Sequence, residues 1–185
     1  TRDEFNDRIR RAFEFLEKAA GDGRVSLYGT ATWSGYRQPE SERGYLSLEE
    51  MVKIAREVGG EAHHFRVIQL PYSLAMPEAI TEATQMVDGE PVSTLMAADR
   101  LGITVMCSAS ILQSKLTRSL PPFVAEALTG LTSDAQRAIQ FVRSTPGVTT
   151  ALVGMSQRSH VEENLATARV PPASVDDFFK MFSNN

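Results

Sequence analysis

The sequence predicts an α/β protein built on a parallel sheet, and two features of the chain indicate this fold class. Apolar segments rich in β-branched residues alternate with amphipathic helical segments at intervals of roughly 40 residues, as in strand–helix–strand units. Each apolar segment is nearly continuous, which is typical of strands covered on both faces. The pattern indicates four parallel βα units behind one leading helix.

The elements can be placed from the residues at their boundaries. Three helices begin at capping boxes, in which Ser or Thr is followed three residues later by Glu or Gln: Thr1 with Glu4, Ser47 with Glu50, and Ser133 with Gln136. The four strands are predicted over residues 24–33, 65–70, 103–108 and 148–153. Glycines end the first three helical patterns, and Asp88-Gly89 predicts a turn.

The remaining segments are assigned from composition. Residues 34–45 form a polar loop, and residues 109–132 form a long connection with one helical turn. Residues 92–101 predict a helix that Gly102 closes. The apolar residues between positions 175 and 182 predict a short helix that packs back on the core.

Composition and charge exclude several classes of protein. The 185 residues are 42% hydrophobic and 23% charged, which is typical of one soluble globular domain. A formal net charge of -4 with scattered basic residues argues against nucleic-acid binding. Cys107 is the single cysteine, so no internal disulfide can form and a reducing, cytoplasmic location is expected. No apolar run approaches membrane-spanning length, so no membrane partner is expected.

The segment after the last strand has the form of an anion-binding turn. Gly154 follows the strand, and a helix with Val161 and Leu165 on one face begins shortly afterwards. The first backbone N–H groups of a helix are unpaired and favour negative charge, and Ser156, Gln157 and Ser159 add side-chain donors. This motif is also common in turns that bind no ligand.

Four stretches at the strand ends resemble the aldo-keto reductase family in order and spacing. They are Tyr28-Gly29-Thr30-Ala31-Thr32-Trp33, Val67 to Leu74, Val105 to Gln113, and Leu152 to Ser156 with Glu163-Asn164. The resemblance implies a TIM (β/α)8 barrel and makes residues 1–185 its C-terminal half-barrel, with the fifth to eighth strands. On this interpretation the chain is either a fragment of a longer polypeptide or a self-associating half-barrel.

The resemblance also implies what the chain does. The parent protein is expected to be an NAD(P)H-dependent oxidoreductase that reduces a small aldehyde or ketone carbonyl. Because the family's catalytic tetrad lies on the first four units, no residue of this chain is assigned a catalytic role, and we expect the chain alone to be inactive. The alternative is a non-catalytic NADPH-binding regulatory module, and a purely structural domain would bind no nucleotide.

Residues of the cofactor site are implied position by position. Thr32 and Gln69 correspond to residues that hold the nicotinamide carboxamide, and Ser108 replaces the usual stacking aromatic residue. The pyrophosphate stretch corresponds to Ala109, Ser110 and Ile111. The residues placed at the adenosine phosphate and the adenine are Gly154, Ser156, Gln157, His160, Glu163 and Asn164. NADPH is the expected cofactor, with NADH as the alternative.

Other chemistry-bearing residues have simpler interpretations. His63 and His64 are adjacent in an extended segment, so they point to opposite sides and predict a solvated loop rather than a metal site. Cys107 is expected to be a small buried hydrophobe without reactivity. The four tyrosines are expected in the core or in loops.

Overall fold

The computed structural model describes residues 1–183 and contains the predicted parallel sheet. Its strands are β1 (Tyr28–Ala31), β2 (Phe65–Pro71), β5 (Thr104–Ser108) and β6 (Val148–Ala151), in the order β1-β2-β5-β6. The α/β prediction is therefore confirmed. The chain divides into two units, described separately below: Thr1–Leu70 with Glu78–Val105, and Pro71–Pro77 with the chain from Met106 onward.

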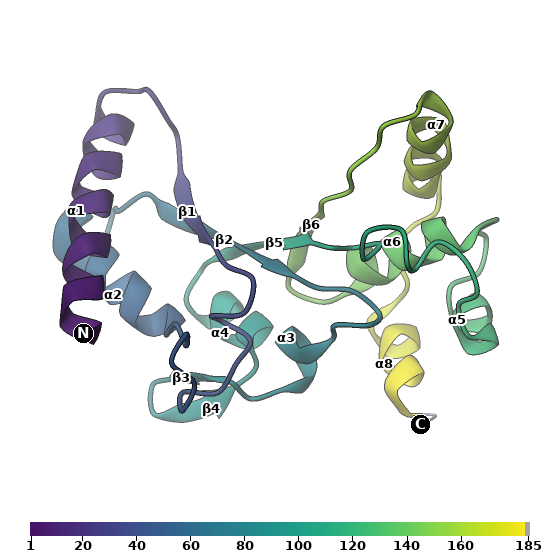
Figure 1. The fold of residues 1–185 in the computed structure, drawn as a ribbon, viewed down its shortest axis with the longest axis horizontal. Helices are drawn as coiled ribbons and strands as arrows, with labels where there is room; N and C mark the ends of the chain where they lie inside the picture. Colours follow the sequence, from purple (N-terminus) through teal and green to yellow (C-terminus); the bar gives the residue numbers. More distant parts are fainter. Residues whose placement is uncertain (184–185) are drawn as a thin grey trace. The chain divides into compact units, whose positions relative to one another are not determined.

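The first unit contains the two helices with the clearest capping signals. In α1 (Arg2–Gly21) the Thr1 hydroxyl accepts from the Glu4 N–H at 3.2 Å, and in α2 (Leu48–Gly59) the Ser47 hydroxyl accepts from the Glu50 N–H at 3.2 Å. The two helices lie side by side (Figure 1). Both predicted capping boxes are thus confirmed as N-caps.

The core of this unit is aromatic where α1 meets β1 and β2. Phe13, Tyr28 and Phe65 are buried, with ring centroids 5.0 to 5.8 Å apart. Gly29 follows Tyr28 at a register irregularity between β1 and β2. A Cβ at Gly29 would lie 2.0 Å from the Val67 carbonyl oxygen, so only glycine permits this close approach of the strands.

The predicted strand boundaries are too long at both ends of the sheet. The prediction for residues 24–33 is wrong outside Tyr28–Ala31, and that for residues 148–153 is wrong beyond Ala151. β6 is also only partly buried rather than fully buried. Since β1 and β6 stand at the two ends of the strand order, each has a strand neighbour on one side only among residues 1–183.

The sequence missed several short elements between β2 and α4 (Thr94–Arg100). They are α3 (Glu78–Thr81) and the antiparallel hairpin of β3 (Gln85–Val87) and β4 (Glu90–Val92). The Asp88-Gly89 turn is confirmed, with both residues at positive φ. Three-residue strands are too short to show periodicity, and β4 also removes Val92 from the helix predicted over residues 92–101.

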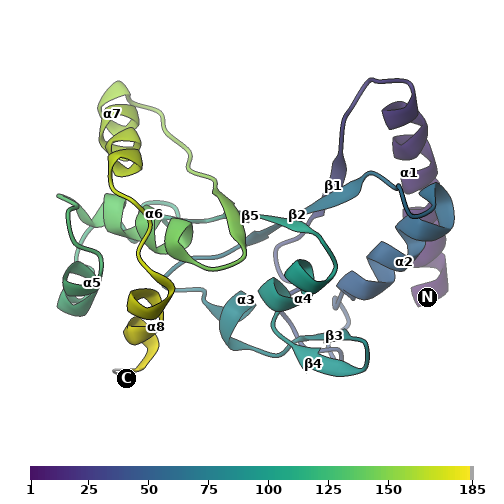
Figure 2. The ribbon, with the colours of Figure 1, turned by 180° about the vertical axis from the view of Figure 1, so that it is seen from behind.

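The second unit packs its helices around α6 (Asp134–Ser144). Its other helical elements are α5 (Pro122–Ala127), α7 (Arg158–Ala166), the 3-10 turn Thr167–Arg169 and α8 (Val175–Ser183). Helix α6 lies along β6, and α5 contacts α8 (Figure 2). Phe178 of α8 is fully buried, which confirms that the tail forms a helix packed on the core.

Glu17 of α1 joins its helix to the amino ends of β1 and β2. Its Oε1 accepts from the Tyr28 hydroxyl at 2.9 Å and from the His64 N–H at 2.7 Å, and its Oε2 lies 2.7 Å from His64 Nδ1. The prediction of a solvated loop is wrong for His63, which is only 5% exposed and accepts from Arg66 at 2.8 Å. The His64 side chain is 40% exposed and lies just before β2. Burial, reinforced by the charge of Arg66, lowers the pKa of His63.

The Glu17 carboxylate makes stability depend on pH. Partial burial raises its pKa, but the hydrogen bonds from the backbone and ring of His64 and from Tyr28 outweigh burial and hold the pKa below the ordinary 4.5. A lowered carboxyl pKa stabilises the fold above pH 4.5, and this contribution is lost as the pH falls through the folded-state pKa. We expect Glu17→Gln to cost about 1–3 kcal/mol at pH 7 and less in acid.

Urea unfolding between neutral and acidic pH measures this effect. Glu14→Gln, an exposed change on the same helix, serves as the control and should unfold in parallel with the wild-type chain. If Glu17→Gln also runs parallel to the wild type across this range, Glu17 does not contribute as described.

Within residues 1–183, no helix is both long and apolar enough to cross a bilayer.

Candidate functional site

The carboxyl ends of β1 and β2 bring Thr32 and Gln69 together in the first unit. Ala31 stands opposite Gln69 in the parallel register, and the Thr32 N–H donates to the Gln69 carbonyl oxygen at 3.0 Å. The Thr32 hydroxyl accepts from the Gly35 N–H at 2.9 Å. A hydroxyl that accepts one bond still carries its own hydrogen, so Thr32 can donate to a carbonyl group of a ligand.

In the second unit the ends of β5 and β6 meet. The Leu152 N–H donates to the Cys107 carbonyl oxygen at 2.8 Å, and the Tyr72 N–H donates to the Ser108 carbonyl oxygen at 3.0 Å. Cys107 itself is fully buried, and burial raises the pKa of its thiol to about 12, so it is not a nucleophile at neutral pH.

The loop after β5 has a distinctive backbone. Ala109 has a φ of 58°, and Leu112, Gln113 and Ser114 are also at positive φ. Such values are uncommon for residues other than glycine and occur where surrounding structure fixes the chain. Ser110 is 1% exposed and its hydroxyl donates to the Cys107 carbonyl at 3.3 Å, so that side chain binds its own strand end. The Ser110 hydroxyl is therefore engaged within the loop rather than directed at a ligand.

The amino end of α7 is open to solvent. Gln157 is the N-cap residue, and the described residues show no capping bond from its side chain. The Val161 N–H donates to the Gln157 carbonyl, so the N–H groups before it lie in the first turn, where a helix supplies no partner. Ser156, Gln157 and His160 are exposed, and the first turn contains no acidic residue. This end can accept an anion.

Glu163 and Asn164 lie further along α7 and are both partly buried. The Gln136 amide of α6 donates to the Glu163 carbonyl oxygen at 2.9 Å and ties α7 to α6. The apolar face predicted from Val161 and Leu165 is not a buried face: Leu165 is 62% exposed, and in α7, which the structure describes throughout, no residue is buried. Within its unit, α7 is held to α6 by this polar bond.

Two polar residues near the strand ends have surroundings that the sequence did not reveal. Ser73 follows β2 and is fully buried, and its hydroxyl has no hydrogen-bond partner among the described residues. Gln85 is also fully buried and accepts from the Leu48 N–H at 2.8 Å. Local composition carried no signal for either, because a serine after a strand and a glutamine before a turn are usually solvated.

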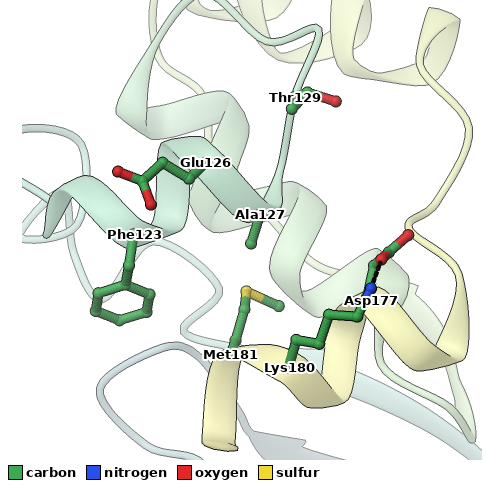
Figure 3. Close-up of a pocket in the computed structure, with 7 residues that line it drawn as sticks. All are labelled: Phe123, Glu126, Ala127, Thr129, Asp177, Lys180 and Met181. Carbon is green, nitrogen blue, oxygen red and sulfur yellow. Dashed lines mark hydrogen bonds and ion pairs between the residues drawn. The ribbon is translucent and has the colours of Figure 1, made fainter. Parts of the chain in front are cut away.

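A pocket of about 450 Å³ lies elsewhere in the second unit, between α5 and α8 (Figure 3). Phe123, Ala127 and Met181 supply its apolar surface, and Lys180 pairs with Asp177 at 2.7 Å at its rim. These residues are not among those that the sequence assigned to a cofactor. Across residues 1–183, no group of His, Cys, Asp and Glu side chains is arranged to hold a metal ion.

Comparison with known proteins identifies the fold through structure alone. No family model matches the sequence, and no curated protein matches it. The fold is similar to the holo form of aldo-keto reductase AKR11C1 from Bacillus halodurans, with a TM-score of 0.63 and 15% identity over 92% of this chain and 54% of that chain. It is also similar to the thermostable aldo-keto reductase Tm1743 in complex with the inhibitor epalrestat, with a TM-score of 0.62 and 13% identity over 95% of this chain and 54% of that chain.

A third match is the glycerol dehydrogenase AKR11B4 from Gluconobacter oxydans, with a TM-score of 0.51 and 17% identity over 96% of this chain and 56% of that chain. The chain therefore spans about half the length of the solved structures that it matches. Its four-stranded parallel sheet and helices correspond to about half of an aldo-keto reductase (β/α)8 barrel.

Proposed function

We propose that this chain is the cofactor-holding, C-terminal half of an NADPH-dependent oxidoreductase that reduces aldehyde or ketone carbonyls, with NADH as the alternative cofactor. The observation that carries the proposal is the likeness of the fold to half of an aldo-keto reductase barrel. In barrels of this kind the ligand binds at the carboxyl ends of the strands. Polar residues suited to a nucleotide follow the strands at those ends.

Each unit contains donors that fit one part of a dinucleotide. The open first turn of α7, with Ser156 and His160 beside it and no acidic residue within it, suits a phosphate. Gly154 leaves open space where a side chain would otherwise stand. Thr32 and Gln69, adjacent at the ends of β1 and β2, suit the carboxamide of a nicotinamide.

In the proposed reaction this chain binds and orients, and the bound nicotinamide supplies the hydride chemistry. The developing alkoxide needs a proton donor, and the tyrosines of this chain do not provide one. All four tyrosines are buried, and burial raises the pKa of Tyr36 to about 12 despite its hydrogen bond to Thr30. We therefore place the acid outside this chain.

A fluorescence titration with NADPH, and separately with NADH, tests the cofactor assignment. We expect saturable NADPH binding that Gln69→Ala and Asn164→Ala each weaken about 5- to 10-fold, equivalent to about 1 to 1.4 kcal/mol of lost hydrogen bonding. Ser159→Glu should weaken it by a similar factor, because the new carboxylate repels a phosphate at the α7 amino end.

Two changes at exposed positions serve as controls, Thr149→Ala on β6 and Glu162→Gln on α7. The Glu162 carboxylate pairs with Arg158 at 2.7 Å. Both should bind like the wild type. Absence of nucleotide binding by a folded chain would contradict the proposal.

Turnover separates the two functions that remain open. We expect no NADPH-dependent reduction of 4-nitrobenzaldehyde by the chain alone, because a missing general acid costs about two to four orders of magnitude in rate. The second function is a non-catalytic NADPH-binding module that regulates a partner. The buried tyrosines fit this alternative because such a module needs no proton donor. Activity restored by adding the complementary half-barrel of a related reductase would support the enzyme, and binding without restored activity would support the module.

A further inference from the structure

The turn after β1 is built tightly around the Thr32 hydroxyl. That hydroxyl accepts from the Gly35 N–H at 2.9 Å, and the Leu46 N–H donates to the Gly35 carbonyl oxygen at 2.8 Å. A Cβ at Gly35 would lie 2.9 Å from Thr32 Oγ1 and 2.8 Å from Leu46 Cγ, so the chain approaches the hydroxyl as closely as glycine permits. The path of the turn therefore sets the position of this hydroxyl.

Arg37 fixes this path with its side chain. The side chain is 8% exposed, and its Nη2 donates to the Trp33 carbonyl oxygen at 2.9 Å while its Nη1 donates to Glu78 Oε2 at 2.8 Å. Trp33 directly follows Thr32, and Glu78 begins α3, so the guanidinium ties the start of the turn to a helix far along the chain. The planar guanidinium presents its donors in a fixed fork, so it sets the angle between the two acceptors as well as their separation.

Tyr36 anchors the turn a second time. It is fully buried, its hydroxyl bonds to the Thr30 hydroxyl at 2.6 Å, and its carbonyl oxygen accepts from Gln85 at 3.0 Å and from Thr94 at 2.7 Å. With β1 fixed before it and Tyr36 fixed after it, the short segment between them can rearrange only locally. Loss of the Arg37 side chain should therefore disturb that segment without unfolding the loop.

We propose that Arg37 is a positioning residue for the nicotinamide end of the cofactor, and that it acts by holding the Thr32 hydroxyl in place beside Gln69. This inference rests on the proposed function, which assigns Thr32 and Gln69 to the nicotinamide carboxamide. Arg37 does not itself bind the ligand, since its guanidinium is largely buried and donates to Trp33 and Glu78. A hydroxyl that is held in place before binding need not be ordered by the ligand, which raises the affinity.

Calorimetric titration with two ligands tests the proposal. NADPH contains the nicotinamide, whereas adenosine 2′,5′-bisphosphate contains only the adenosine phosphates. We expect Arg37→Met to weaken NADPH binding about 5- to 10-fold and to leave binding of the bisphosphate unchanged within about twofold. Thr32→Ala should show the same difference between the ligands. The double variant Thr32→Ala/Arg37→Met should bind NADPH no more weakly than Thr32→Ala alone, because no hydroxyl is left to position.

Arg43→Met, at an exposed position of the same loop, is the matched control and should bind both ligands like the wild type. Arg37→Lys retains the charge and can keep one of the two bonds, so it should show a smaller loss of the same kind. It replaces Arg37→Met in the test if circular dichroism shows that Arg37→Met is not folded.

Three results would overturn the proposal. They are an equal loss of both ligands, which a merely structural role predicts, NADPH binding that neither change at Arg37 weakens, and losses that add in the double variant. In each case Thr32→Ala and Gln69→Ala would still weaken NADPH binding if the proposed function holds. Absence of NADPH binding by the folded wild-type chain would instead contradict the proposed function, and this inference with it.

Discussion

Phe141→Ala should destabilise the second unit by about 3–5 kcal/mol. Phe141 of α6 is 2% exposed and is the ring on which the aromatic core converges. Tyr72 stacks on it with centroids 5.6 Å apart, and Phe178 and Phe182 of α8 lie 5.3 and 6.2 Å from it. Truncation removes these contacts and leaves a cavity, because the surrounding rings can collapse only partly. A loss of this size is a large part of the stability of a typical domain.

Urea denaturation measures the effect as a lower midpoint of the unfolding transition. The transition should be followed by both fluorescence emission and circular dichroism. Phe15→Ala is the matched control, since Phe15 is 63% exposed and its truncation should cost less than about 1 kcal/mol. If Phe141→Ala costs no more than this control, the packing of α8 on α6 is not what stabilises the unit.

Gln85→Leu should cost about 2–4 kcal/mol and loosen the loop that follows β1. The Gln85 amide donates to the carbonyl oxygens of Tyr36 and Leu46 at 3.0 Å, and its oxygen accepts from the Leu48 N–H at 2.8 Å. Tyr36 retains a bond from the Thr94 hydroxyl at 2.7 Å. The leucine would leave the buried Leu48 N–H and the partly buried Leu46 carbonyl without these partners, and an unpaired buried donor is costlier than an ordinary lost hydrogen bond.

Hydrogen exchange should locate this loss, because the amides of residues 34–48 should exchange faster in the variant. Urea denaturation should show a lower midpoint. Gln113→Leu, at an exposed position, is the control and should leave both unchanged within about 0.5 kcal/mol. Unchanged exchange at Leu48 in Gln85→Leu would show that another group replaces the lost acceptor.

Part of the candidate site followed from the sequence. Thr32 and Gln69 were predicted at the ends of neighbouring parallel strands, and their backbones are joined by a hydrogen bond of 3.0 Å. The direction of the Ser110 hydroxyl, back to Cys107, could not be predicted because it depends on a positive φ at Ala109. Whether these residues bind a nucleotide stays a prediction.

The sequence by itself determined several helix boundaries. Thr1, Ser47 and Ser133 cap their helices, and Gly60 and Gly102 end two of them at positive φ, because caps and left-handed residues act within one turn of the chain. Only the tertiary structure decided the length of β1, the burial of His63 and the exposure of Leu165. Each of these depends on a neighbour far away in the sequence, and the local pattern contains no information about which neighbour is present.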